Sequence, residues 1–387
     1  MRFPIDPARP FGLPPAFVAG AIWTATFALL VGLWLAGHVP SISYGVYAAA
    51  GQRWLEGKPL YDTTNIEGFQ YFPQSAMLLA PLSALGSPAG DILWRALAWI
   101  VLATGTLRLT KQLAPQRWGE GFFIATCVSI GPTIGPLGNG QANLLLAGLT
   151  LHVAADVAAK HWWRATVVMA LGIALKPLIA VLVLLVWALY RPMRWRVPLA
   201  LLVVFVTPWL VRDHAYVLAQ YADCLTKLEI GARPGPDYED IRGLLATLGW
   251  VMPHDVATVV RLLAALGVLG LCFRARKCLR ESYAAVLVAA FAVAYLMLFN
   301  PRTQSTSYAM PGAVIAVLAA LYLIEERRRA FFVMLAIQTA FTLNYHWLPF
   351  IELWLKPLAC VVFFAFLLHE VVKPPELQHS SQRKVER

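Results

Sequence analysis

Residues 17–33 read FVAGAIWTATFALLVGL, and the polar stretch after them contains YAAAGQRWLEGKPLYD at 47–62 and GFQYFP at 68–73, before LLAPL at 78–82. The first run has the length and composition of a helix that crosses a membrane. The stretch that follows is rich in aromatic and charged side chains, which a simple connection between two membrane helices does not need. We therefore expect residues 38–71 to form a loop with a function of its own at the membrane surface.

The composition of the whole chain is that of an integral membrane protein. Hydrophobic residues fill 59% of the 387 positions, charged residues fill 14%, and the mean hydropathy is +0.62. In soluble domains about a quarter of the residues are charged. The sequence predicts one all-α membrane domain over residues 1–387, a bundle of about 12 transmembrane helices. The predicted spans are 17–37, 72–87, 91–109, 120–136, 141–158, 165–189, 197–216, 255–273, 283–299, 308–324, 331–347 and 351–370.

The net charge of +11 comes from basic residues that gather in short segments between the apolar blocks. Cytoplasmic loops collect Lys and Arg, so this placement indicates membrane orientation rather than nucleic-acid binding; contact with anionic lipids is the alternative. The basic segments 191–196, 274–280 and 327–329 then face the cytoplasm, and loops 38–71 and 217–254 face outward. We expect a multi-pass protein of the bacterial cytoplasmic membrane whose active face is periplasmic or extracellular.

Two short connections disagree with this topology. Residues 109–119 and 159–164 each contain a Lys and an Arg, yet they would face outward in a chain with these spans. Either the charges are tolerated there, or one short block is re-entrant and the local topology shifts. The block at 72–87 is the weakest of the predicted spans.

Two polar motifs interrupt the apolar blocks. The stretch GNGQAN at 138–143 carries the amides of Gln141 and Asn143, which can cap a helix or hydrogen-bond a sugar. Lys176 and Pro177 lie inside a predicted span. A cation there is costly and is usually paired or functional, and a proline kinks a helix.

A third polar cluster, NPRTQSTSY at 300–308, lies on the predicted outward side. Its Arg302 runs against the charge rule, which favours a role in binding anions over an interfacial turn. His346 near an outward helix end is a further ionisable candidate, although a lone interfacial histidine is more often structural. The sequence contains no zinc-ligand spacing, Walker loop or dinucleotide fingerprint, so we expect no cofactor and assign no metal ligand, while a divalent metal is left open.

These motifs resemble, in order, those of glycosyltransferase family 87, which belongs to the GT-C type of membrane enzymes. The first loop matches a Tyr…Gly-x-x-Leu-Tyr…Phe-x-Tyr-x-Pro…Pro-Leu run that starts here at Tyr47. The amide motif at 138–143 matches the family's Gly-Gln-x-Asn, and Lys176-Pro177 matches its Lys-Pro. The resemblance covers most of the chain. It implies transfer of a sugar from a polyprenyl-phosphate donor to an acceptor glycan or lipid on the outer face of the membrane.

Such a transfer needs a carboxylate for the proton of the acceptor hydroxyl, cations near the leaving phosphate, and aromatic rings or amides against the sugar. We assign the carboxylate to Asp62 or Glu67, and the donor phosphate to Lys176 and Arg302. The expected substrate-binding residues are Arg53, Tyr61, Tyr71, Gln141, Asn143 and His346. From residue types alone, an interfacial amphipathic helix over 47–55 is the alternative for the loop.

One position departs from the family pattern. Relatives usually carry an Asp three or four residues before the tyrosine matched by Tyr47, and Ser43 stands there in this chain. A serine hydroxyl cannot act as a general base. Either the base lies at Asp62 or Glu67, or this subgroup works differently, or the chain has lost catalysis. The competing function is a protein that binds or flips a lipid-linked glycan, or an inactive GT-C relative.

Overall fold

The computed structural model describes residues 6–39, 41–65, 67–232, 238–343, 351 and 353–373, and the regular structure in these ranges is helical. The predicted fold class, an all-α membrane bundle, is confirmed. Eight helices in the described ranges are long and apolar enough to cross a membrane, so the predicted number of about 12 is not confirmed by this criterion. The helices are α1 (Pro15–Leu35), α2 (Ile42–Glu56), α3 (Pro73–Ala84), α4 (Ala89–Leu113), α5 (Trp118–Gly138), α6 (Ala142–Ala158), α7 (Trp162–Leu175), α8 (Ala180–Leu189), α9 (Met193–Val206), α10 (His214–Ala232), α11 (Ile241–Thr247), α12 (His254–Cys278), α13 (Glu281–Phe299), α14 (Ala309–Ile324), α15 (Arg328–Thr342) and α16 (Leu355–Val372).

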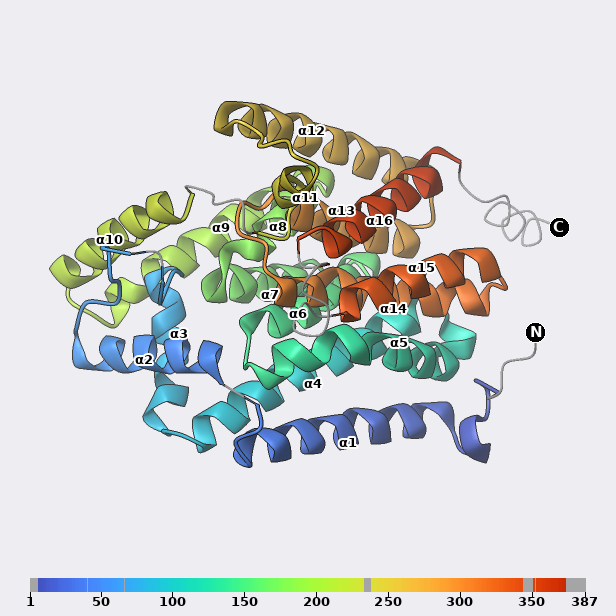
Figure 1. Ribbon diagram of the computed structural model, residues 1–387, viewed down its shortest axis with the longest axis horizontal. Helices are drawn as coiled ribbons and strands as arrows, with labels where there is room; N and C mark the ends of the chain where they lie inside the picture. Colours follow the sequence, from blue (N-terminus) through green and yellow to red (C-terminus); the bar gives the residue numbers. More distant parts are fainter. Residues whose placement is uncertain are drawn as a thin grey trace.

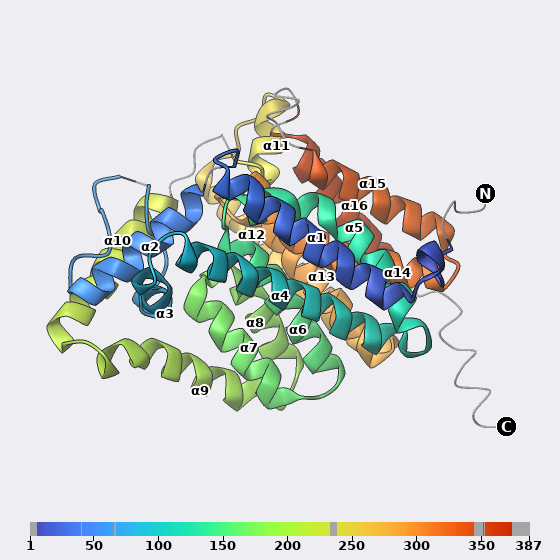
Figure 2. The ribbon, with the colours of Figure 1, turned by 90° about the horizontal axis from the view of Figure 1, so that it is seen from below.

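Most of the long helices run between two ends of an elongated bundle (Figure 1). α2, α3 and α10 gather at one end, on the left of Figure 1 and of Figure 2, and we call it the site end. The opposite end, where α1 begins, carries the basic connections, and we call it the basic end. Ion pairs at the basic end join Arg108 to Asp156, Arg117 to Glu120, Lys160 to Glu281, Arg280 to Glu325 and Arg327 to Glu370.

Helix α3 does not cross the bundle. Tyr44 on α2 donates a hydrogen bond to the carbonyl of Leu82 near the end of α3 (3.4 Å). Ser75, in the first turn of α3, donates to the carbonyl of Leu175 at the end of α7 (2.8 Å). Both ends of α3 therefore lie at the site end, and α4 starts there. The predicted membrane span at 72–87 is therefore not confirmed, and the arrangement of α3 is the one that the re-entrant alternative expects.

This shift brings both discordant connections to the basic end. Lys160 pairs with Glu281 at the start of α13 (2.8 Å). Arg117 donates to the carbonyl of Ile324 at the end of α14 (3.1 Å). Their positive charges thus join the other basic loops on one side, as the charge rule requires.

The predicted span at 165–189 consists of two short antiparallel helices, α7 and α8. The rings of Trp162 at the start of α7 and of Tyr190 just after α8 have centroids 5.8 Å apart, so the chain reverses direction between the two helices. Pro177 causes the break, because it has no N–H and disfavours a helical residue before it. Lys176 is extended, with φ −159° and ψ 127°. Lys176 therefore lies at the tip of a hairpin rather than at a kink inside one transmembrane helix.

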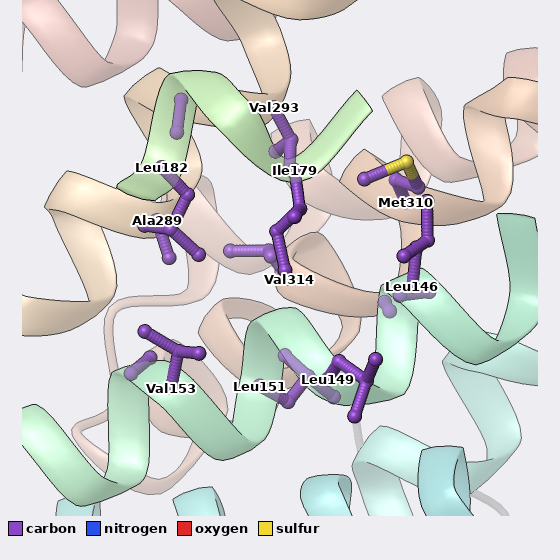
Figure 3. Close-up of a cluster of buried hydrophobic side chains, with 14 of the residues drawn as sticks. Leu146, Leu149, Leu151, Val153, Ile179, Leu182, Ala289, Val293, Met310 and Val314 are labelled. Atoms are coloured by element: carbon purple, nitrogen blue, oxygen red, sulfur yellow. The ribbon is translucent and has the colours of Figure 1, made fainter. Parts of the chain in front are cut away.

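Helix α6 forms the centre of the core. Figure 3 shows Leu146, Leu149 and Leu151 of α6 beside apolar side chains of α8, α13 and α14. On its other side α6 approaches α4 so closely that a Cβ at Gly148 would lie 2.6 Å from the backbone nitrogen of Leu102. Small residues of this kind allow helices in membranes to pack backbone to backbone. The rigid packing of α6 fixes the position of its first turn at the site end.

A buried ion pair joins three segments at the site end. Arg95 and Asp91, one turn apart on α4, pair at 2.8 Å with their side chains 1% and 2% exposed. The guanidinium of Arg95 also donates to the carbonyls of Leu137 and Gly138, which end α5. Ser41, just before α2, accepts from Arg95 (2.8 Å) and donates to Asp91 (2.6 Å). These bonds hold the starts of α2 and α4 against the turn that leads into α6.

We expect Arg95→Met to destabilise the protein by about 3–5 kcal/mol, because removal of one partner leaves the other charge buried and unpaired. The measurement is unfolding of the detergent-purified protein during titration with sodium dodecyl sulfate. The control is Arg53→Met, since Arg53 is exposed on α2. Equal stability of the two variants would contradict the role given to Arg95.

Candidate functional site

Lys176 lies at the centre of the candidate site. Its Nζ donates to Oδ1 of Asn143 (2.7 Å) and lies 5.0 Å from the centroid of the Tyr71 ring. Among the residues that the structure describes, no carboxylate forms an ion pair with this ammonium, which is only partly exposed. A cation held by an amide and an aromatic ring in an apolar protein is a ready partner for an anion.

Gln141 and Asn143 connect this lysine to the loop after α13. The Nδ2 group of Asn143 donates to Oε1 of Gln141 and to Oγ of Ser307, both at 3.1 Å. The Thr306 hydroxyl donates to the same oxygen of Gln141 (2.8 Å). Neither amide caps α6, because Gln141 at the N-cap position makes no side-chain capping bond. The capping interpretation therefore does not describe these side chains.

Arg302 lies next to the segment that carries Tyr71. Its Nη1 donates to Oε1 of Gln70 (2.5 Å), and its Nε donates to the hydroxyl of Tyr238 (3.1 Å). Both partners are neutral. Burial raises the pKa of the Tyr71 phenol above its ordinary value, while its hydrogen bond with Tyr47 and the positive charge of Arg302 oppose that rise. The structure thus brings Lys176 and Arg302 into one cluster with Tyr71, since Lys176 contacts the Tyr71 ring and Arg302 binds the neighbouring Gln70.

Two further tyrosines surround Tyr71. The hydroxyls of Tyr47 and Tyr71 are 3.4 Å apart, and Tyr47 also accepts from the backbone N–H of Ala142 (3.3 Å). Burial raises the pKa of Tyr47, and the charge of Lys176 opposes this rise. Tyr61 is 6% exposed and donates to the carbonyl of Tyr71 (2.6 Å). Tyr61 therefore supports the backbone of the site and does not present its ring to a ligand.

Asp62 and Glu67 lie on an exposed loop beside this cluster. The carboxylate of Asp62 accepts from the hydroxyl (2.6 Å) and N–H (2.9 Å) of Thr64 and from the amide of Asn65 (2.5 Å). These bonds, first that from the Thr64 hydroxyl, hold the pKa of Asp62 below its usual value. Asp62 is therefore ionised at neutral pH, and both of its oxygens are already used within the loop.

Lys227, which the sequence analysis did not select, holds this loop in place. Its side chain on α10 is buried, and its Nζ donates to the carbonyls of Asp62 (2.6 Å), Asn65 (2.6 Å) and Glu67 (2.5 Å). Burial lowers the pKa of Lys227, and the negative charge of Asp62 opposes this change. A lysine whose partners are backbone carbonyls leaves no signal in the sequence, so pattern reasoning could not find it.

Two other predicted site residues, and the position where relatives carry an Asp, remain to be placed. Arg53 is exposed on α2, and among the described residues its guanidinium donates only to the carbonyl of Leu60 (3.4 Å). His346 lies outside the described residues. The N–H of Ser43 donates to Oδ1 of Asn139 (3.4 Å) in the first turn of α2. Asp91 of α4 reaches the start of α2 through Ser41 (2.6 Å), but its carboxylate is already paired with Arg95.

No group of three or more His, Cys, Asp or Glu side chains suited to a metal ion occurs in the ranges that the structure describes. The polar groups of the site are instead two cations, two amides and the phenols of Tyr47 and Tyr71. This set can hold an anion beside a hydroxyl-rich ligand.

Comparison with known proteins adds a relative that acts on lipid-linked sugars. Over 183 residues the chain is 27% identical to a polyprenol-phosphate-mannose-dependent alpha-(1-2)-phosphatidylinositol mannoside mannosyltransferase of Mycolicibacterium smegmatis. The alignment covers 41% of this chain and 40% of the relative, so the chain spans less than half of that protein's length.

A family model gives a longer match. The model of glycosyltransferase family 87 matches residues 69–301, which is more than half of the 387 residues. The matched range contains Tyr71, Gln141, Asn143 and Lys176 and ends one residue before Arg302. The family resemblance noted from the sequence motifs is confirmed. This chain belongs to glycosyltransferase family 87.

Proposed function

We propose that this protein transfers a sugar from a polyprenyl-phosphate donor to an acceptor glycan or lipid at the outer face of the cytoplasmic membrane. One observation carries the proposal: Lys176 contacts the Tyr71 ring, Arg302 binds the adjacent Gln70, and each cation is hydrogen-bonded to neutral partners alone among the described residues. Family membership and the donor named for the mycobacterial relative support the same donor class.

The two cations suit the phosphate of the donor. A phosphate between them would exchange neutral hydrogen bonds for charge-assisted ones, which are about twice as strong. The same cations would stabilise the negative charge that grows on the phosphate as it leaves. The amides of Gln141 and Asn143 and the rings of Tyr47 and Tyr71 then remain for the sugar.

The transfer itself moves one sugar and one proton. The acceptor hydroxyl oxygen forms a bond to the anomeric carbon, and the bond from that carbon to the phosphate oxygen breaks. The polyprenyl phosphate leaves with the bonding electrons, and a carboxylate takes the hydroxyl proton. We propose Asp62 or Glu67 for this base, because Lys227 holds their loop beside the cationic cluster.

The phosphate site is tested by binding of polyprenyl monophosphate, the proposed leaving group, to the purified protein. We expect Lys176→Met and Arg302→Met each to weaken binding about tenfold to a hundredfold, since a charge-assisted hydrogen bond contributes roughly 1.5–3 kcal/mol. Lys58→Met is the control, because Lys58 is exposed and pairs with Glu56 (2.8 Å). Polyprenol without the phosphate should bind all forms equally. Unchanged affinity in both variants, with the fold intact, would remove the phosphate site.

The base is tested by transfer from polyprenyl-phosphate mannose, used as a probe donor, to lipid extract. Asp62→Asn or Glu67→Gln should lower the rate about 10²–10⁴-fold while polyprenyl monophosphate still binds, as for removal of a general base. Full activity in both variants and in their combination would refute the assignment. A wild-type protein that binds the lipid phosphate but transfers no sugar would favour the competing function in binding or flipping a lipid-linked glycan.

The orientation is tested by single cysteines in a background without the native cysteines. Lys58 and Gln304 are exposed at the site end, and Lys160 is exposed at the basic end. In intact cells a membrane-impermeant thiol reagent should label cysteines at 58 and 304 and spare the one at 160, because basic loops stay in the cytoplasm. The reverse pattern would place the site inside and exclude the outward-facing reaction.

A further inference from the structure

A buried carboxylate lies in the segment that contacts Arg302. Glu239 comes shortly before α11 and is buried. Its backbone N–H donates to the carbonyl of Thr303 (2.9 Å), the residue directly after Arg302. The residue before it, Tyr238, accepts a hydrogen bond from Nε of Arg302 (3.1 Å). The chain therefore places a negative charge beside one of the two cations of the candidate site.

Arg302 does not pair with this carboxylate. Its guanidinium donates to Oε1 of Gln70 and to the hydroxyl of Tyr238, and both acceptors are neutral. An arginine and a carboxylate can form two parallel charge-assisted hydrogen bonds, which are about twice as strong as neutral ones. The carboxylate of Glu239 would therefore compete for Arg302 if another cation did not hold it.

Lys356, in the first turn of α16, is a cation that faces Glu239. Its Nζ lies 4.0 Å from Oε2 of Glu239, and both side chains are 8% exposed. The same Nζ donates to the hydroxyl of Ser305, and the Tyr308 hydroxyl donates to the carbonyl of Glu239 (2.8 Å). A buried lysine in an apolar protein is costly, so its placement against this carboxylate indicates a specific role.

We propose that Lys356 holds the carboxylate of Glu239 away from Arg302 and thereby keeps Arg302 available for the phosphate of the donor. Lys356 is a positioning residue in this role, because it acts through Glu239. The inference rests on the phosphate site proposed above. A buried carboxylate that loses a cation gains by pairing with another, and Arg302 offers one in the adjoining segment. Such a pair would occupy the N–H groups that the phosphate needs.

A purely structural ion pair predicts a different pattern. Glu239 and Lys356 would then be equally necessary for phosphate binding, because each would hold the 302–308 loop through the other. In the proposed role the two residues have opposite effects, since the carboxylate opposes phosphate binding and the ammonium removes that opposition. The two roles are therefore distinguished by removing each partner in turn.

The test is binding of polyprenyl monophosphate to the purified full-length protein. We expect Lys356→Met to weaken binding about tenfold or more, Glu239→Gln to retain or raise the affinity, and Lys356→Met/Glu239→Gln to restore it. The control Arg327→Met breaks the buried ion pair with Glu370 at the basic end, so it should lower stability and leave phosphate binding unchanged. Weaker binding in Glu239→Gln and in the double variant would overturn the proposal.

An Arg302→Met background separates this inference from the donor site itself. There Lys356→Met should have no further effect, since no guanidinium remains for Glu239 to neutralise. An equal loss in both backgrounds would overturn the inference and leave the phosphate site intact. If Arg302→Met alone does not weaken binding, the assignment of the phosphate to Arg302 fails, and this inference fails with it.

The neutral pair keeps the test decisive if Lys356→Met does not fold. Replacement of both partners of a buried ion pair by neutral side chains is often tolerated, whereas removal of one partner is strongly destabilising. For Lys356→Met/Glu239→Gln the proposal predicts the affinity of the wild type, and a structural ion pair predicts weaker binding.

Discussion

The site end of this protein is organised around the need to satisfy one buried guanidinium. Arg95 lies in an apolar helix bundle where water cannot solvate its charge, so each of its donors must find an acceptor within the protein. Asp91, Ser41 and the last two carbonyls of α5 supply them. Because these acceptors come from three segments, satisfying the guanidinium also fixes where α2 begins and where the chain turns from α5 into α6.

The cationic cluster depends on that placement. The turn into α6 carries Gln141 and Asn143, and α2 carries Tyr47, so both elements must be held before Lys176 can reach its amide partner. The hairpin tip and the loop after α13 complete the cluster from the opposite side. Lys176, Arg302 and Lys227 bring three positive charges to this region. Their partners are neutral oxygens or rings, which do not compensate these charges. None of these three cations forms an ion pair with a carboxylate in the part of the chain that the structure describes.

Hydropathy located the apolar blocks well, but it did not show whether a block runs from one end of the bundle to the other or turns back. Block 72–87 is apolar, yet both ends of α3 lie at the site end. Block 165–189 is continuous in hydropathy although Pro177 reverses the chain. The basic residues at 109–119 and 159–164 indicated this error in the predicted topology. They lie at the basic end only if block 72–87 starts and finishes at the site end.

The sequence likewise predicted some residues of the candidate site and missed others. Lys176, Asn143 and Tyr71 were predictable because a charge or amide beside an apolar block is conspicuous. Their mutual contacts were not, because they join positions far apart in the sequence. Lys227 escaped notice since its partners are carbonyls, which every residue has. Arg53 was selected for its residue type, yet it lies exposed on the far side of α2 from the buried Tyr47 and Tyr44.

The shortness of the hairpin has a consequence for the surrounding lipid. α7 has 14 residues, and the helical turn Pro177–Ile179 adds three residues to the 10 of α8, so each arm rises about 21 Å, whereas a hydrocarbon core is about 30 Å thick. A bilayer meets such hydrophobic mismatch by thinning locally or by letting polar groups sink into it. In a bilayer of ordinary thickness such a hairpin would leave its tip, with Lys176, below the level of the headgroups. The distance that a long-chain phosphate must move to reach Lys176 would then depend on the thickness of the bilayer.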